Sequence, residues 1–211
     1  AAHVETTFVM LESRAFYEAY SHTLFLLKEL AMGLAHGERT LPFGKYLLGN
    51  TVDIEHLKYL EECAEMSFSC LTSYGDDTIA PIKNICAVDV RDLTTWPSSI
   101  ELGLDISQHK ALKLALTKEI SLIQGPPGTG KTTMGIRIAE LLLSNKHAWR
   151  GHTRKPMLIV SYTNHALDQF LQLLLNTPVM TNCLPKDVVR VGSRCEIQHL
   201  DKFTLKSHRK L

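Results

Sequence analysis

The chain has 211 residues, enough for one domain or for one domain and part of another. Its 23 Lys and Arg residues nearly balance 22 Asp and Glu residues, which excludes a polybasic or acidic tail as the main functional feature. Hydrophobic residues at 45% and charged residues at 21% indicate a globular chain, and no apolar run reaches the about 18 residues of a membrane span, so we expect no membrane insertion. No signal peptide is visible at Ala1; one could have been removed, but we favour a piece of a larger protein.

The first hundred residues predict a mixed segment of helices and strands that carries no chemical motif. Apolar residues recur with a helical period over 11–32, and a second helix is expected over 53–66. Residues 78–93 have the composition of β-structure. The loop Trp96-Pro97-Ser98-Ser99 is typical of a boundary, so we expect one domain over 1–100 and another over 101–211.

The second half alternates short apolar runs with amphipathic runs. Helices are expected over 105–117, 131–144 and 165–175, and strands over 120–124, 156–161 and 188–191. The continuous apolar run from Met157 to Val160 is typical of a strand buried on both faces of a parallel sheet. The order of elements predicts right-handed βαβ crossovers, and therefore an α/β fold with helices on both faces of a parallel sheet.

The cysteines predict free thiols. There are five, an odd number, and they are widely spaced without a C-x-x-C pair. Cys63 and Cys70 could share a helical face, but one such pair does not make a zinc site. This usage favours a reducing compartment such as the cytoplasm.

The strongest motif is a phosphate-binding loop, which fits the pattern G-x-x-x-x-G-K-[ST] and reads Gly125, Pro126, Pro127, Gly128, Thr129, Gly130, Lys131, Thr132, Thr133. Its glycines let successive N–H groups point inward, where they and the following helix N-terminus attract negative charge. Lys131 is then expected to reach the β- and γ-phosphates, and the Thr132 hydroxyl to ligate Mg²⁺. Pro126 and Pro127 stiffen the loop. The alternative is a loop that only turns the chain.

Polar residues around this loop are candidates for further contacts. Gln108 opens the preceding helix, and its amide can pair with adenine, although an exposed Gln is more often only solvated. Thr163 and Asn164 follow the second predicted strand; they can cap a helix or, with its amides, hold a nucleic-acid phosphate. Arg190 and Arg194 lie at the end of the third predicted strand and just after it, and they are candidate contacts to a nucleic-acid backbone.

Together these motifs resemble the first part of a superfamily 1 helicase core. The pair GPPGTGKT and SYTNHALDQ is similar to the up-frameshift-like RNA helicases. The spelling YTNHALDQFL, with FYEAYSHTLFLLKEL and PFGKYL upstream, resembles the NFX-type zinc-finger-containing helicases, which are large cytoplasmic proteins linked to RNA silencing and antiviral RNA sensing. The resemblance covers most of the chain and is strongest over 102–195.

The resemblance implies a RecA-like P-loop domain that uses ATP and Mg²⁺. Gln108 would read adenine, and Gly125 to Thr133 would hold the triphosphate. The residues implied to touch single-stranded RNA, without sequence preference, are Thr163, Asn164, His165, Arg190 and Gly192. The implied partners are this RNA, a second RecA-like domain, and proteins of RNA silencing or of cytoplasmic RNP granules.

One expected motif is missing. A helicase core needs an acidic strand end after the loop, but no apolar run followed by Asp-Glu occurs there, and Asp76-Asp77 precedes the loop in a turn context. We therefore expect an incomplete piece of an ATP-dependent RNA helicase, with the sheet ending before the acidic strand and no turnover by the piece alone. The alternatives are a nucleotide-gated RNA-binding scaffold without motor activity and a small-molecule kinase or other P-loop enzyme.

Overall fold

The computed structural model describes residues 17–35, 44–47, 53–72, 85–150, 155–192, 195 and 197–209. The chain divides into two compact units, 1–53 and 54–211. The helices of the first unit are α1 (Tyr17–Ala35) and α2 (Gly44–Leu47). Among the described residues, no helix is long and apolar enough to span a bilayer.

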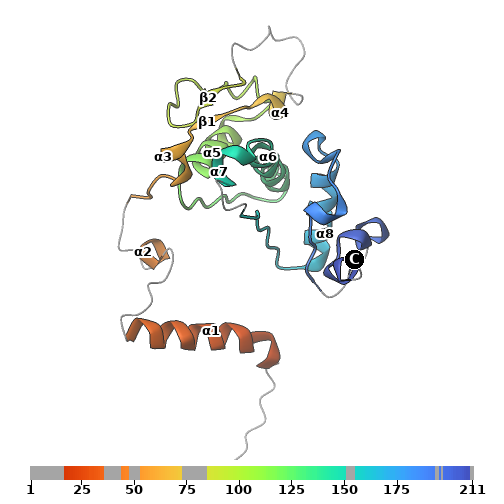
Figure 1. The fold of residues 1–211 in the computed structure, drawn as a ribbon. Coiled ribbons are helices and arrows are strands. Elements are labelled where there is room, and N and C mark those ends of the chain that lie inside the picture. The colour runs from red at the N-terminus through yellow and green to blue at the C-terminus, as the bar shows by residue number, and fades with distance from the viewer. Residues whose placement is uncertain are drawn as a thin grey trace, which may run out of the picture. The chain divides into compact units, whose positions relative to one another are not determined.

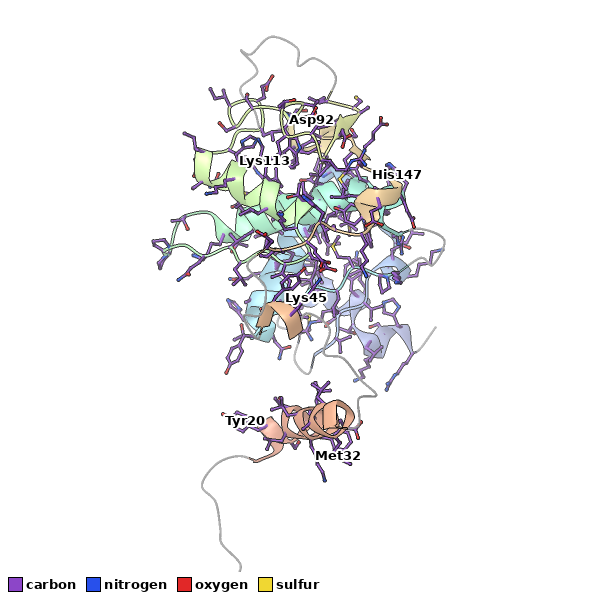
Figure 2. All side chains as sticks on the ribbon, turned by 90° about the vertical axis from the view of Figure 1, so that its left-hand side faces the viewer. Tyr20, Met32, Lys45, Asp92, Lys113 and His147 are labelled. Carbon is purple, nitrogen blue, oxygen red and sulfur yellow. The ribbon has the colours of Figure 1, made fainter. Side chains whose placement is uncertain are left out.

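Helix α1 dominates the described part of the first unit. It bears out the helix predicted over 11–32 for the part that is described, and it continues past Gly33 to Ala35; residues 11–16 lie outside the described ranges. Large apolar side chains are exposed along it, including Tyr20 at 62% and Met32 at 54%, which Figure 2 labels.

The second unit contains the remaining elements shown in Figure 1. Its α-helices are α3 (Tyr59–Glu62), α4 (Ser69–Thr72), α5 (Ile106–Thr117), α6 (Lys131–Ser144), α7 (Lys146–Arg150), α8 (Asn164–Leu175) and α9 (Leu205–His208). Short 3-10 helices are η2 (Pro178–Met180), η3 (Pro185–Asp187) and η4 (Gln198–Phe203). Strands β1 (Glu65–Met66) and β2 (Val88–Asp89) pair antiparallel.

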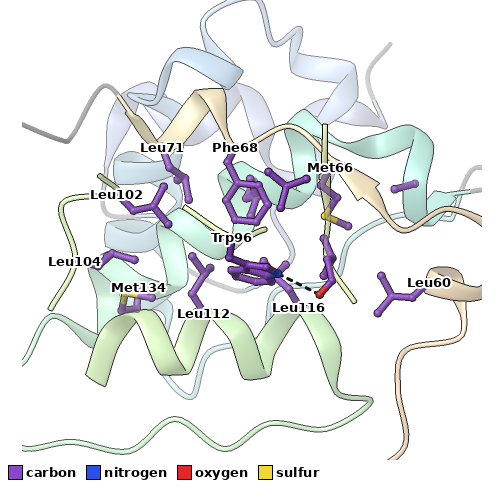
Figure 3. Packing of buried hydrophobic residues seen from close by; sticks show 14 residues of the cluster. Leu60, Met66, Phe68, Leu71, Trp96, Leu102, Leu104, Leu112, Leu116 and Met134 are labelled. Atoms are coloured by element: carbon purple, nitrogen blue, oxygen red, sulfur yellow. Dashed lines mark hydrogen bonds between the residues drawn. The ribbon is translucent and has the colours of Figure 1, made fainter. Parts of the chain in front are cut away.

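The main core joins residues 54–72 and 85–104 to helices α5 and α6 (Figure 3). Trp96 is 7% exposed, and its ring meets Phe68 edge to face at 5.0 Å. Its Nε1 donates to the Val90 carbonyl at 3.1 Å. Leu112 of α5 and Leu141 of α6 are fully buried in the same cluster. The segment Trp96–Ser99 is a loop, as predicted. Its first residue, Trp96, lies in a core that contains residues from both sides of this loop.

Hydrogen bonds fix the same segment to α6. The buried Asn145 side chain donates to the Ser67 carbonyl at 2.9 Å and accepts from the Ser67 amide at 2.8 Å. Arg137 donates to the carbonyls of Leu102 at 2.9 Å and Gly103 at 3.1 Å. Since α6 begins at the phosphate loop, the segments around Ser67 and Leu102 stabilise the helix that carries the candidate site.

The helix predicted over 53–66 is wrong for most of its length. Only α3 is helical, and at Cys63 the backbone becomes extended, with φ −147° and ψ 105°. Strand β1 follows and pairs with β2, and the Ala64 carbonyl accepts from the Val90 amide at 2.9 Å. Pairing with a distant segment overrides the helix-favouring composition. Strand β2 lies within the β-rich stretch 78–93, whose first part, 78–84, lies outside the described residues.

The three helices predicted in the second half are confirmed as α5, α6 and α8. Helix α5 starts at a capping box, because Asp105 accepts from the Gln108 amide at 2.8 Å and Gln108 accepts from the Asp105 amide at 3.2 Å. Helix α8 starts at Thr163, whose hydroxyl accepts from the Ala166 amide at 3.2 Å. These signals are local, so the sequence alone reveals them.

The strands predicted over 120–124, 156–161 and 188–191 are not formed. In the third, Arg190 makes one parallel bridge to Thr204, and the only sheet in the described part of the chain is β1–β2. Leu122 is 93% exposed and Leu158 is 84% exposed, although their runs have the apolar pattern of buried strands. A strand is stabilised by hydrogen bonds to a neighbouring strand. Among the described residues, no strand pairs with 120–124 or with 156–161. The parallel sheet is therefore absent from the described structure.

Candidate nucleotide and nucleic-acid site

Two positions of the phosphate loop have a backbone conformation that favours glycine. Gly128 and Gly130 have φ of +82° and +79°, in the left-handed region that disfavours side chains. A Cβ at Gly125 would lie 2.6 Å from Thr129 Oγ1, and one at Gly130 would lie 2.9 Å from Gln108 Nε2. Side chains at Gly125 and Gly130 would therefore crowd Thr129 and Gln108, and the glycines form a tight cradle before α6.

Lys131 is held by carbonyl groups of this loop. Its Nζ donates to Gly125 at 2.8 Å and to Pro126 at 2.7 Å. The Thr129 hydroxyl also donates to the Pro126 carbonyl, at 2.8 Å. The ammonium group is exposed at the first turn of α6, so a phosphate could take the place of these neutral acceptors and make a stronger, charge-assisted contact.

The N-terminus of α6 suits an anion and a metal ion bound to it. Its N-cap, Gly130, provides no side-chain cap, and Thr132 and Thr133 are exposed in the first turn. In the described ranges no cluster of three or more His, Cys, Asp or Glu could hold a metal. Mg²⁺ would therefore depend on the Thr132 hydroxyl and on phosphate oxygens, which are ligands that it prefers.

Gln108 joins α5 to the loop. Besides its part in the capping box, its Nε2 donates to the Thr129 carbonyl at 3.3 Å. Hydrogen bonds to Ser107 and to the Gln108 amide lower the pKa of Asp105, the partner in that box. The structure thus places Gln108 beside the loop, where its amide holds protein groups; pairing with adenine remains a prediction.

His109, the next residue, anchors the start of α5 to the core. Its Nε2 lies 2.9 Å from the Pro97 carbonyl, and its ring meets Trp96 edge to face at 6.4 Å. Burial, with a smaller contribution from the charge of Lys113, lowers the pKa of His109. The side chain is therefore suited to the neutral form.

The predicted nucleic-acid residues lie around the start of α8. Thr163 caps the helix, Asn164 is half-buried in its first turn and His165 is exposed. Gly192 lies beside them, because a Cβ there would clash with Asn164 Oδ1 and lie 2.9 Å from Arg190 Nη1. The structure thus brings Asn164, Arg190 and Gly192 together from two segments.

Arg190 differs from the others because the residue as a whole is only 3% exposed. Its Nε donates to Asp168 Oδ1 at 2.8 Å and its Nη2 to Asp168 Oδ2 at 3.2 Å. The same Nη2 donates to Asn164 Oδ1 at 3.2 Å. The guanidinium therefore faces protein groups and is not presented as an exposed surface charge. Arg194, the other basic candidate, and Asp76-Asp77 lie outside the described residues.

One groove connects the two regions. It has a volume of about 700 Å³ and runs between the first turn of α6, residues 159–161 and α8. Its lining includes Thr132, Ser161, Ala166, Gln169, Phe170 and Leu173. At Gly135 a Cβ would lie 3.0 Å from Phe170 Cε2, so α6 and α8 approach closely below it. Thr132 of the phosphate loop and Ala166 of the first turn of α8 thus share one cavity.

Sequence reasoning missed Asp168 and Asn145. Asp168 lies on the buried face of α8 with Leu171 and Leu174, and a charged residue in that apolar pattern was the available signal for a buried ion pair. Asn145 follows α6 as an ordinary helix-ending residue, and nothing in the sequence predicts its contact with Ser67, 78 residues away.

The chain matches one family model and several known proteins. A family model described as "AAA domain" matches residues 103–210. The chain is 37% identical over 209 residues to human "NFX1-type zinc finger-containing protein 1", covering 96% of this chain and 10% of that protein. It is 32% identical over 199 residues to fission yeast "Helicase required for RNAi-mediated heterochromatin assembly 1", covering 94% and 17%.

A shorter match reaches another helicase. Over 91 residues the chain is 36% identical to fission yeast "ATP-dependent helicase upf1", covering 43% of this chain and 9% of that protein. The chain thus spans about a tenth of the first relatives that it matches. No solved structure gives a significant match.

Proposed function

Because this chain belongs to the AAA-domain family and is related to superfamily 1 helicases of the NFX1-type and up-frameshift-like groups, we propose that it forms part of an ATP-dependent RNA helicase motor. The family implies a P-loop NTPase fold. The observation that carries the proposal is the glycine cradle that holds Lys131, followed directly by Thr132, which lines the groove that reaches α8.

On the nucleotide side, the backbone amides of the loop and of the first turn of α6 bind the phosphates. Lys131 leaves the carbonyls of Gly125 and Pro126 and neutralises charge on the γ-phosphate. Thr132 provides a hydroxyl ligand for Mg²⁺, which when bound supplies further neutralisation of the phosphate charge. Gln108 orients the base.

On the nucleic-acid side, the start of α8 and Gly192 contact the backbone of single-stranded RNA. Support comes from the exposed residues His165 and Ala166 in the first turn of α8 and from the name of one relative, a helicase required for RNAi-mediated heterochromatin assembly. Contacts to phosphate carry no base readout, so binding tolerates sequence and weakens with salt. ATP-driven closure against a second RecA-like domain would then move the RNA.

We also propose the RecA-like sheet that the described residues lack. The segments 120–124 and 156–161 flank α6 and expose Leu122, Leu158 and Val160, the last at 80%. Neighbouring strands from a longer chain would cover these side chains and provide the backbone hydrogen bonds that a sheet needs. The length of the relatives supports this, since the chain matches only about a tenth of the first of them.

The decisive experiment measures RNA-stimulated ATP hydrolysis by the natural full-length protein. Lys131→Ala should abolish hydrolysis, whereas the matched control Lys110→Ala, which removes an exposed lysine from α5, should retain it. Equal turnover by Lys131→Ala and wild type would refute the motor. ATP binding without turnover in the wild type would favour a nucleotide-gated scaffold, and hydrolysis indifferent to RNA would favour another P-loop enzyme.

The cellular role proposed is RNA silencing or antiviral RNA surveillance in the cytoplasm, including RNP granules, with proteins of those pathways as partners. The name of the fission yeast relative supports the part about RNA silencing, and the five free cysteines support a reducing compartment. Crosslinking of the tagged full-length protein to nucleic acid in cells tests the role in RNA silencing or surveillance, and cell fractionation tests the location. Recovery of DNA in place of RNA would contradict the role in RNA silencing or surveillance.

A further inference from the structure

The ion pair between Asp168 and Arg190 is almost completely buried. Both side chains are 1% exposed, and two parallel hydrogen bonds of 2.8 and 3.2 Å join the guanidinium to the carboxylate. Asp168 lies in the second turn of α8, whereas Arg190 lies 22 residues later in the segment that leads to Gly192. The pair therefore ties together two segments that the proposed function assigns to RNA.

Stability alone does not account for such a pair. Removing two charges from water costs free energy that their attraction often fails to recover, and apolar residues of similar volume frequently serve as well. A two-pronged Arg–carboxylate contact does, however, fix distance and orientation more tightly than apolar packing. The geometry, rather than the charge, is what this pair provides.

The fixed geometry reaches the exposed end of the site. Arg190 Nη2 also donates to Asn164 Oδ1 at 3.2 Å, so the guanidinium orients a side chain in the first turn of α8. On the other side, Gly192 lies so close to Asn164 and Arg190 that a Cβ there would clash. Arg190 also forms a parallel bridge opposite Thr204: its amide donates to the Phe203 carbonyl at 2.7 Å and its carbonyl accepts from the Leu205 amide at 3.1 Å. These bonds hold the second segment in place.

We propose that Asp168 and Arg190 are positioning residues, which hold the first turn of α8 and residues 190–192 together as one preformed corner that grips the RNA backbone. This rests on the proposed function, and it changes the role predicted for Arg190 from a phosphate contact to a support behind the contacts. Asn164 and the backbone at Gly192 then face the RNA, and Arg190 does not.

The two roles predict opposite effects for Asp168→Asn. Removing a negative charge near a phosphate-binding surface normally strengthens RNA binding, and freeing Arg190 would strengthen it further if Arg190 touched phosphate. A positioning pair predicts the reverse, because the corner loses its geometry. In the full-length protein we expect RNA affinity to fall by about tenfold or more, equivalent to about 1.4 kcal/mol, and ATP affinity to fall much less.

A second variant keeps the test decisive if Asp168→Asn folds poorly. Arg190→Lys retains the positive charge but cannot make the two-pronged contact. A phosphate contact would survive this change, whereas a positioning residue would not. Binding of a fluorescent single-stranded RNA is measured at several salt concentrations, because loss of a phosphate contact lowers the slope of log affinity against log salt by about one, and loss of positioning leaves it unchanged.

Asp89→Asn is the matched control. It breaks an Asp–Arg pair of 3.1 Å to Arg91 that is exposed at the surface, and RNA binding should stay at the wild-type value. Weaker binding by both test variants at an unchanged salt slope supports the proposal. Wild-type or tighter RNA binding by Asp168→Asn, or retained RNA binding by Arg190→Lys, overturns the positioning role. The proposed function still stands in that case, provided that the wild type binds RNA. A wild type that binds no RNA overturns both.

Discussion

Truncation of Trp96 tests whether residues 54–104 and the phosphate-loop helix form one cooperative unit. Trp96 is 7% exposed between Phe68 and α5, with Nε1 bonded to the Val90 carbonyl (Figure 3). Truncating a buried aromatic residue to alanine costs about 3–5 kcal/mol. The edge-to-face contact with Phe68 accounts for about 1 kcal/mol of this. We therefore expect Trp96→Ala to lower the free energy of unfolding by about 4 kcal/mol.

Two companion variants separate the causes. Trp96→Phe keeps most of the ring but removes the donor to Val90, so the loss should be about 1–2 kcal/mol. Leu93→Ala changes a side chain in the same loop that is 51% exposed, and it should change stability by less than about 0.5 kcal/mol.

Urea unfolding followed by far-ultraviolet circular dichroism gives these values, and binding of a fluorescent ATP analogue reports on the loop. We expect one transition in every variant, with weaker nucleotide binding in Trp96→Ala because α6 loses its support. A loss below about 1 kcal/mol for Trp96→Ala, or separate melting of residues 54–104, would refute the shared core.

Three further predictions concern the loop, a histidine and the unformed strands. Gly130→Ala should weaken ATP-analogue binding more than Gly128→Ala in a titration, because both substitutions strain a left-handed backbone but only a Cβ at position 130 would meet Gln108; an unchanged difference between the two variants in a Gln108→Ala background would contradict this reason. Since the pKa of His109 is lowered from 6.5 by burial, its contribution to stability is present above about pH 6.5 and is lost as the pH falls through the lower folded value, so unfolding of His109→Gln should depend less on pH there; parallel pH profiles would contradict this. Hydrogen exchange at residues 156–161 should be slow in the full-length protein and fast in the 211-residue chain; equally fast exchange in both would exclude the proposed sheet.

Sequence patterns predicted the elements whose causes are local. Helix α5 is specified by Asp105 and Gln108, α8 by Thr163, and the phosphate loop by its glycines, and each signal lies within a few residues of its effect. The same patterns did not predict structure that depends on contacts with residues far away in the sequence. Composition at 53–66 favours a helix, but pairing of β1 with β2 makes its end extended.

The candidate site shows the same division. The positions of Lys131 and Thr132 follow from the motif, but the hydrogen bonds from Lys131 to Gly125 and Pro126 do not. The sequence predicts Arg190 as a contact to a nucleic-acid backbone, but it does not predict the buried ion pair, because the partner Asp168 is 22 residues away in another segment. Burial of a charge depends on tertiary neighbours, which a spacing pattern does not contain.

The most direct test of the phosphate-binding site is a crystal structure of the protein with a non-hydrolysable ATP analogue. We predict that the phosphates lie in the cradle of Gly125 to Thr133, and that Lys131 Nζ has moved from the carbonyls of Gly125 and Pro126 onto them. Nucleotide bound elsewhere, or Lys131 still bonded to both carbonyls beside a bound nucleotide, would contradict the assignment.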